Sequence, residues 1–164
     1  MSFFSFLGVE SFYLLVMPAI LWSYDVALGF RVGLILLTSA SLNSILKLAF
    51  GLPRPYWISR KVRPYGVASS FGFPSGHAQN AVSIWGRLAA AVRKNWAVAG
   101  AVALTGLISL SRLYLGVHFP LGVLAGWLIG GLILGAFLWL EKPLWRAFTF
   151  FTLIAQLGTM VVLS

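Results

Sequence analysis

Long apolar runs constrain the fold of this chain more than any other feature of its sequence. They cover residues 3–23, 27–49, 77–93, 96–114, 120–140 and 143–163. Each is close to the ~20 residues that an α-helix needs to cross a bilayer, and a helix satisfies its own backbone hydrogen bonds there. The sequence therefore predicts an all-α integral membrane bundle of about six transmembrane helices, in a single domain over residues 1–164.

The composition excludes a soluble domain. Hydrophobic residues make up 60% of the chain and charged residues 9%, whereas a soluble domain is usually ~25% charged. The chain has no cysteine, which excludes a disulfide framework and a thiolate metal site. The chain has no basic residue before Arg31, and its first apolar run is not followed by a cleavage site. We therefore expect this run to form a helix bent near Pro18 rather than a signal peptide.

The net charge of +9 indicates which partners the chain suits. Such a charge favours anionic lipid headgroups or phosphate-bearing substrates. Nucleic acid is disfavoured, because the basic residues form neither one polar tail nor one helix face.

Residues 51–74 form the one long polar connection. Their prolines and glycines exclude a spanning helix, and their aromatic residues favour the headgroup level. With about six crossings, this connection, the end of the second helix, the start of the third and the link between the fourth and fifth all lie on one face. The polar candidates for a site converge on that face.

The positive-inside rule is used to orient this face. The convergent face carries Lys47, Arg54, Arg60, Lys61, Arg63 and Arg112. The opposite face carries Arg31, Arg87, Arg93, Lys94, Lys142 and Arg146. If Lys47, Arg54 and Arg112 are set aside because they serve the chemistry of a site, the convergent face keeps fewer basic residues than the opposite face. The convergent face is then expected on the extracytoplasmic side of a multi-pass cell-membrane protein.

Lys47 and Arg54 form the first candidate group, in "KLAFGLPRP". One compact cation and one planar guanidinium can hold a phosphate between them. Snorkelling of Lys47 to the headgroups is the alternative.

Ser75, Gly76 and His77 form the second group, in "FGFPSGHAQN", where the third spanning helix is predicted to begin. Free backbone N–H groups and a hydroxyl at a helix start bind anions, and a histidine transfers protons near neutral pH. A serine cap followed by an interfacial histidine remains an equal alternative.

Arg112 and His118 form the third group, in "SRLYLGVHFP". An arginine or a histidine within or next to a membrane usually has a functional role, because an unpaired charge there is costly. Arg112 could instead contact lipid phosphate, which would not explain His118.

Together the groups contain three cations, an anion site at a helix start and both histidines of the chain. The sequence has no cysteine and only 3 acidic residues, which disfavours a metal-dependent hydrolase. Phosphoryl transfer without metal or organic cofactor, with one histidine as nucleophile and one as acid, fits this set.

The same motifs resemble a known family. Three segments are similar to the three motifs of the type-2 phosphatidic acid phosphatase superfamily, which includes vanadium haloperoxidases. They are Lys47 with Arg54-Pro55, then Pro74-Ser75-Gly76-His77, then Ser111-Arg112 with His118. The resemblance covers residues 47–127. It implies a six-helix core with an extracytoplasmic active site, His118 as the nucleophile and His77 as the acid. It also implies that the phosphoryl oxygens are held by Lys47, Arg54, Ser75, Gly76 and Arg112.

Gly122 departs from the family pattern, which has an aspartate four residues after the nucleophilic histidine. An aspartate there would orient the imidazole, as in a serine-protease triad. We expect Gly122 to leave His118 under-oriented and the enzyme weak or inactive. Alternatively Gly122, Gly126 and Gly130, spaced every four residues, form a packing stripe.

The sequence thus predicts a membrane lipid phosphatase acting on a lipid phosphomonoester or diphosphate. A lipid phosphotransferase and an inactive anionic-lipid binding protein remain alternatives. Haloperoxidase activity, which would require vanadate, is the least expected.

Overall fold

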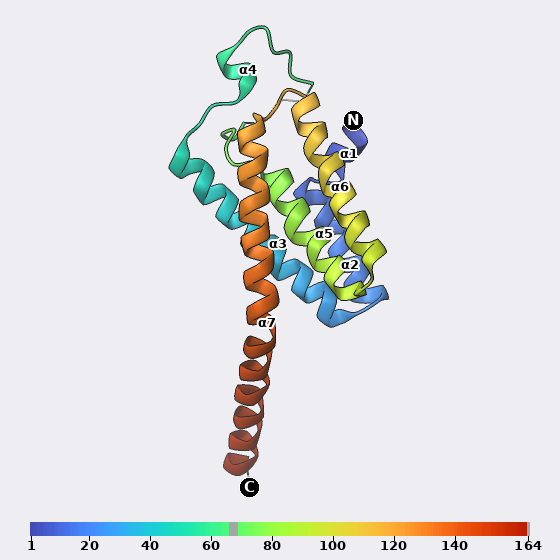
Figure 1. Ribbon diagram of the computed structural model, residues 1–164. Helices are drawn as coiled ribbons and strands as arrows, with labels where there is room; N and C mark the ends of the chain where they lie inside the picture. The colour runs from blue at the N-terminus through green and yellow to red at the C-terminus, as the bar shows by residue number, and fades with distance from the viewer. Residues whose placement is uncertain (66–68, 164) are drawn as a thin grey trace. The chain divides into compact units, whose positions relative to one another are not determined.

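The computed structural model describes the backbone of residues 1–65 and 69–163, and the side chains of this part except those of Lys142 and of residues 144–163. All regular structure in this part is helical, which confirms the predicted all-α class (Figure 1). The helices are α1 (Ser2–Phe6), α2 (Glu10–Ser23), α3 (Val26–Phe50), α4 (Pro55–Ile58), α5 (Gly76–Val92), α6 (Asn95–Tyr114) and α7 (Pro120–Leu163).

Three stretches of the described part are long and apolar enough to cross a membrane: Val26–Ile58, Asn95–Tyr114 and Pro120–Glu141. Large apolar side chains face outward, with Ile45 of α3 62% exposed and Leu128 of α7 66% exposed. Water would penalise such a surface, whereas lipid accepts it. The chain is an integral membrane protein.

The helix boundaries differ from the sequence prediction at both ends. The first apolar run is divided between α1 and α2, and Pro18 lies inside α2. The last two runs are one helix, because α7 continues through Pro143. Only Glu141 and Lys142 separate those runs, which is too short a polar link to force a turn, and a proline is tolerated in a membrane helix.

The contacts divide the chain into two compact units, Met1–Leu134 and Gly135–Ser164. The three sequence motifs all lie in the first unit. That residues 1–164 form a single domain stays a prediction.

Local caps determine where the helices next to the motifs begin and end. Asp25 caps the start of α3, where its carboxylate accepts a hydrogen bond from the Leu28 amide at 2.8 Å. That helix ends at Gly51, whose φ of 60° is left-handed and suits glycine. Ser75 caps the start of α5. Figure 1 shows that the last turn of α3 and the first turn of α5 lie at the same end of the bundle.

A buried polar seam joins α3 to α5 and consists of Ser39, Asn43, Gln79 and Asn80. The Asn43 amide donates to Gln79 Oε1 at 2.9 Å, the Gln79 amide donates to the Ser39 carbonyl at 2.8 Å, and the Ser39 hydroxyl donates to Asn80 Oδ1 at 2.6 Å. Buried polar groups that satisfy one another fix the relative register of two helices. This seam positions the start of α5.

The glycine stripe of α7 packs directly against the backbone of α5. A Cβ atom added at Gly126 would lie 2.6 Å from the Ser75 carbonyl oxygen, and one added at Gly130 would lie 2.6 Å from the Gln79 carbonyl oxygen. Only glycine permits such an approach. The packing interpretation of the stripe is therefore confirmed at these two positions.

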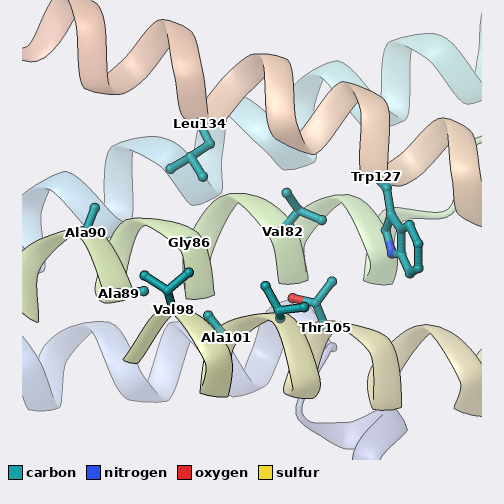
Figure 2. Close-up of a pocket in the computed structure, with 10 residues that line it drawn as sticks. Val82, Gly86, Ala89, Ala90, Val98, Ala101, Thr105, Trp127 and Leu134 are labelled. Atoms are coloured by element: carbon teal, nitrogen blue, oxygen red, sulfur yellow. The ribbon is translucent and has the colours of Figure 1, made fainter. Parts of the chain in front are cut away.

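Small side chains leave an apolar cavity of about 450 Å³ beside α5, α6 and α7. Figure 2 shows Gly86, Ala89 and Ala101 around it, with Trp127 at one end. The indole of Trp127 donates to the Ser109 hydroxyl at 2.8 Å. None of the lining residues belongs to the three motifs, so this cavity is separate from the candidate site.

Candidate active site

Arg54 joins the two loops that carry the site. Its guanidinium donates from Nε to the Ser70 carbonyl at 2.7 Å and from NH2 to the Phe71 carbonyl at 3.3 Å. From NH1 it donates to the Val117 carbonyl at 3.0 Å. The side chain is 2% exposed. Arg54 thereby ties the loop before α5 to the link between α6 and α7.

His118 lies in that link and is 4% exposed. Its Nδ1 is 2.7 Å from the carbonyl oxygen of Gly72. Because a carbonyl only accepts, Nδ1 must carry the proton, and Nε2 of the neutral ring keeps its lone pair. Nε2 lies 3.4 Å from NH1 of Arg54.

The protonation of His118 follows from its surroundings. Burial lowers the pKa of His118 from 6.5 to about 3, and the positive charge of Arg54 acts in the same direction. The hydrogen bond to the Gly72 carbonyl opposes this shift. His118 is therefore neutral at physiological pH, which is the form that can act as a nucleophile.

Lys47 reaches the site from the last turn of α3. Its Nζ donates to the Ser70 hydroxyl at 3.2 Å, and NH2 of Arg54 donates to the same hydroxyl at 3.1 Å. Ser70 thus brings together the two cations that the sequence paired.

Ser75, Gly76 and His77 form the start of α5, as predicted. The Ser75 hydroxyl accepts from the Ala78 amide at 3.5 Å, so the serine is the helix cap. The Ser75 amide donates to the Gly122 carbonyl at 2.9 Å, which ties α5 to α7. His77 packs against Gly8, where an added Cβ atom would lie 3.1 Å from its ring.

Arg112 approaches from the last turn of α6 and is 9% exposed. Its NH1 donates to the Ser5 hydroxyl of α1. Its Nε is buried without a hydrogen-bond partner in the described part of the chain. A buried donor that lacks an acceptor is costly, so a bound anion would satisfy it.

The structure places all three motifs at one end of the bundle. The charges of Lys47, Arg54 and Arg112 are close enough to act on His118. Within the described residues, no three His, Cys, Asp or Glu side chains are grouped as metal ligands. The arrangement can bind an anion and present a neutral imidazole to it.

In the structure, Nδ1 of His118 has an acceptor, the Gly72 carbonyl oxygen at 2.7 Å, and the expected effect of Gly122 on activity stays a prediction. A Cβ atom added at Gly122 would lie 3.3 Å from the Gly72 oxygen and 3.9 Å from Nδ1 of His118. Position 122 therefore lies beside this hydrogen bond.

An apolar cavity of about 510 Å³ is lined in part by Phe119, the residue after His118, and by Gly72, whose carbonyl contacts Nδ1 of His118. It is lined by Leu52, Pro53, Ile58, Gly72, Phe73, Phe119, Pro120, Leu121 and Gly122. A cavity with an apolar lining suits the alkyl chain of a ligand.

Three parts of the site were not predicted from the sequence: Ser70, Gly72 and the polar seam. Asn43 and Gln79 could have been noticed, since polar residues inside apolar membrane runs are usually functional or structural. Gly72 acts through its backbone carbonyl, and such a role leaves no side-chain signal in a sequence.

A helical membrane bundle with two histidines and three buried or half-buried cations at one end is the arrangement that the resemblance implied. Residues 28–146 match the model of the PAP2 superfamily, and the chain belongs to this superfamily.

Several characterised proteins are similar to the chain. Phosphatidylglycerophosphatase B of Bacillus subtilis is 36% identical over 58% of this chain and 49% of its own length. Human sphingosine-1-phosphate phosphatase 2 is 30% identical over 78% of this chain and 34% of its own length. The chain thus spans about half or less of these relatives.

A solved structure has the same fold. The transmembrane PAP2-type phosphatidylglycerolphosphate phosphatase from Bacillus subtilis superposes with a TM-score of 0.77 at 28% identity, covering 87% of this chain and 75% of that one.

Proposed function

We propose that this protein hydrolyses a phosphomonoester or diphosphate of a lipid at the extracytoplasmic surface of the cell membrane. One observation carries the proposal: His118 is buried and neutral, with Nδ1 bonded to the Gly72 carbonyl and Nε2 facing Arg54. The names of the relatives, which are lipid phosphatases, support the substrate class. The apolar cavity lined by Gly72 and Phe119 supports a substrate with an alkyl chain.

The reaction needs two steps. Nε2 of His118 attacks phosphorus and forms a P–N bond while the bond from phosphorus to the leaving oxygen breaks. His77, which must enter this step protonated on both ring nitrogens, donates a proton to that oxygen and becomes neutral. Water then attacks phosphorus while the P–N bond to His118 breaks, and His77 takes a proton from that water. Inorganic phosphate leaves, and His118 is again neutral with the lone pair back on Nε2.

The cations take the place that a metal has in other phosphatases. Lys47, Arg54 and Arg112 neutralise the charge that develops on the phosphoryl oxygens, together with Ser75 and Gly76 at the start of α5. The unpaired Nε of Arg112 is a donor available for this purpose. The proposed reaction uses no metal, organic cofactor or nucleic acid.

The alternative of an inactive lipid binder rested on the missing aspartate. The contact of 2.7 Å between Nδ1 of His118 and the Gly72 carbonyl oxygen supports the active enzyme over this alternative. A phosphotransferase would share the first step and would differ only in the acceptor.

The test is phosphate release by the purified protein in detergent micelles. Phosphatidate, phosphatidylglycerol phosphate, a polyprenyl diphosphate and lipid A phosphate are the substrates to compare, with and without EDTA. We expect release that survives EDTA; loss with EDTA and recovery with magnesium would refute the metal-free mechanism. Labelled phosphate found on a second lipid instead of in solution would indicate a transferase.

A second measurement tests the nucleophile. We expect His118→Ala to abolish turnover, while binding to vesicles containing phosphatidate persists through Lys47, Arg54 and Arg112. Turnover at the parent rate would show that His118 does not attack phosphorus.

A further inference from the structure

We infer that the backbone carbonyl of Gly72 is the positioning group for His118 and replaces the aspartate that Gly122 leaves out. The catalytic part of this inference rests on the proposed function. The geometric part concerns the histidine alone and can be tested without substrate.

The hydrogen bond between the two groups is short and buried. The Gly72 oxygen lies 2.7 Å from Nδ1 of His118, whose side chain is 4% exposed. Water cannot readily compete for Nδ1–H in such a place, so this acceptor determines both the tautomer and the ring orientation.

The carbonyl of Gly72 is held in place from several directions. The Gly72 amide donates to the Leu52 carbonyl at 2.8 Å. On the preceding residues, Arg54 binds the carbonyls of Ser70 and Phe71. An acceptor fixed in this way is preorganised, as an orienting carboxylate is in other enzymes.

Glycine at position 72 is required by close backbone contact. A Cβ atom added there would lie 2.7 Å from the Pro53 carbonyl oxygen and 3.1 Å from Cα of Arg54. The loop would have to move away from Pro53, and the carbonyl that meets His118 would move with it.

Glycine at position 122 is the counterpart of this arrangement. A Cβ atom at 122 would lie 3.3 Å from the Gly72 oxygen. A carboxylate there would face the carbonyl oxygen while competing with it for one Nδ1 proton. The two acceptors are alternatives, so this chain gains nothing from an aspartate.

The first test is the tautomer of His118 by nitrogen NMR. The chain has 2 histidines, so a ¹⁵N-histidine label in micelles gives few signals, and His77→Gln identifies those of His118. We expect the proton on Nδ1. A predominantly Nε2-protonated ring would overturn the inference, whether or not the protein hydrolyses lipids.

The second test displaces the carbonyl. In Gly72→Ala we expect kcat to fall between about tenfold and about 10⁴-fold, by analogy with loss of an orienting carboxylate. KM should change little, because orientation matters mainly in the transition state. The His118 signals should also show a mixture of tautomers.

Gly131→Ala is the matched control, since a Cβ atom at Gly131 would meet nothing within 4 Å. It should keep the parent kcat and tautomer. A Gly72→Ala protein with both parent kcat and a fully Nδ1-protonated ring would overturn the inference.

The third test adds the aspartate. We expect folded Gly122→Asp to be no faster than the parent, and a strong rise in kcat would overturn the inference. If either glycine variant fails to fold, the tautomer of the parent still decides. An Nδ1-protonated ring in a protein that releases no phosphate from any substrate would refute the proposed function alone.

Discussion

NH1 of Arg54 lies 3.4 Å from Nε2 of His118 and at the same time donates to the carbonyl of the adjacent Val117 at 3.0 Å. One guanidinium therefore faces the proposed nucleophilic nitrogen and also fixes the backbone that carries it. A phosphate oxygen that accepts from this guanidinium would bring its phosphorus close to Nε2. In the proposed reaction, binding and alignment of the substrate would therefore depend on the same side chain.

Replacement of Arg54 by lysine should separate charge from geometry. Arg54→Lys keeps a cation but cannot reproduce the planar set of bonds to Ser70, Phe71 and Val117. We expect kcat/KM for lipid phosphate to fall on the order of 100-fold or more. The exposed Arg60→Lys is the control and should behave as the parent. An Arg54→Lys enzyme within twofold of the parent would mean that charge alone suffices.

The low pKa of His118 should make folding sensitive to acid. His118 has a pKa of about 3 in the folded protein, compared with ~6.5 in an unfolded chain. The stability from keeping this ring neutral is fully present above pH ~6.5 and is lost as pH falls from there toward the folded pKa, because the unfolded chain binds the proton first.

We therefore expect Tm in detergent to fall as pH falls across this range. The free energy of unfolding that this group contributes should decrease by at most about 1.4 kcal/mol per pH unit. His118→Gln cannot titrate and should show a shallower fall. If both proteins had the same pH dependence, protonation of His118 would not be coupled to folding.

The buried polar seam should contribute to stability. Asn43→Ala removes the donor to Gln79 Oε1 and leaves that oxygen buried without this partner. We expect a loss of about 1–3 kcal/mol, read as a lower Tm. Ser44→Ala is the control, because the exposed Ser44 hydroxyl donates to the Ala40 carbonyl of its own helix at 2.9 Å. Equal Tm values for the two variants would show that the seam is not stabilising.

Neighbouring glycines on α7 should respond in opposite ways. In Gly130→Ala the new methyl group would lie 2.6 Å from the Gln79 carbonyl oxygen, so the helices must separate, and we expect a loss of about 1–3 kcal/mol. Gly131→Ala meets nothing within 4 Å and should be neutral or stabilising by up to about 1 kcal/mol. Thermal unfolding of both variants in the same detergent measures the difference, and a reversed order would contradict the close packing of α7 on α5.

Much of the fold and of the candidate site was accessible from sequence because the relevant rules are local. The ~20-residue scale of a spanning helix identified most of the apolar runs. It failed between residues 140 and 143, where one helix continues across two polar residues, since neither residue breaks a helix. Parity then placed Lys47, His77 and His118 at one end of the bundle without any knowledge of packing.

What the sequence determined by itself is the solvent, the helical class and the set of reactive side chains, because hydropathy and residue chemistry are properties of each position. Only the tertiary structure decided how His118 is oriented. The acceptor is a backbone carbonyl 46 residues away along the chain, brought within 2.7 Å of Nδ1 by a loop that Arg54 and Leu52 hold in place. Every residue has a carbonyl, so no residue type marks the one that will be used, and the missing aspartate at Gly122 could be interpreted only once Gly72 was seen in its place.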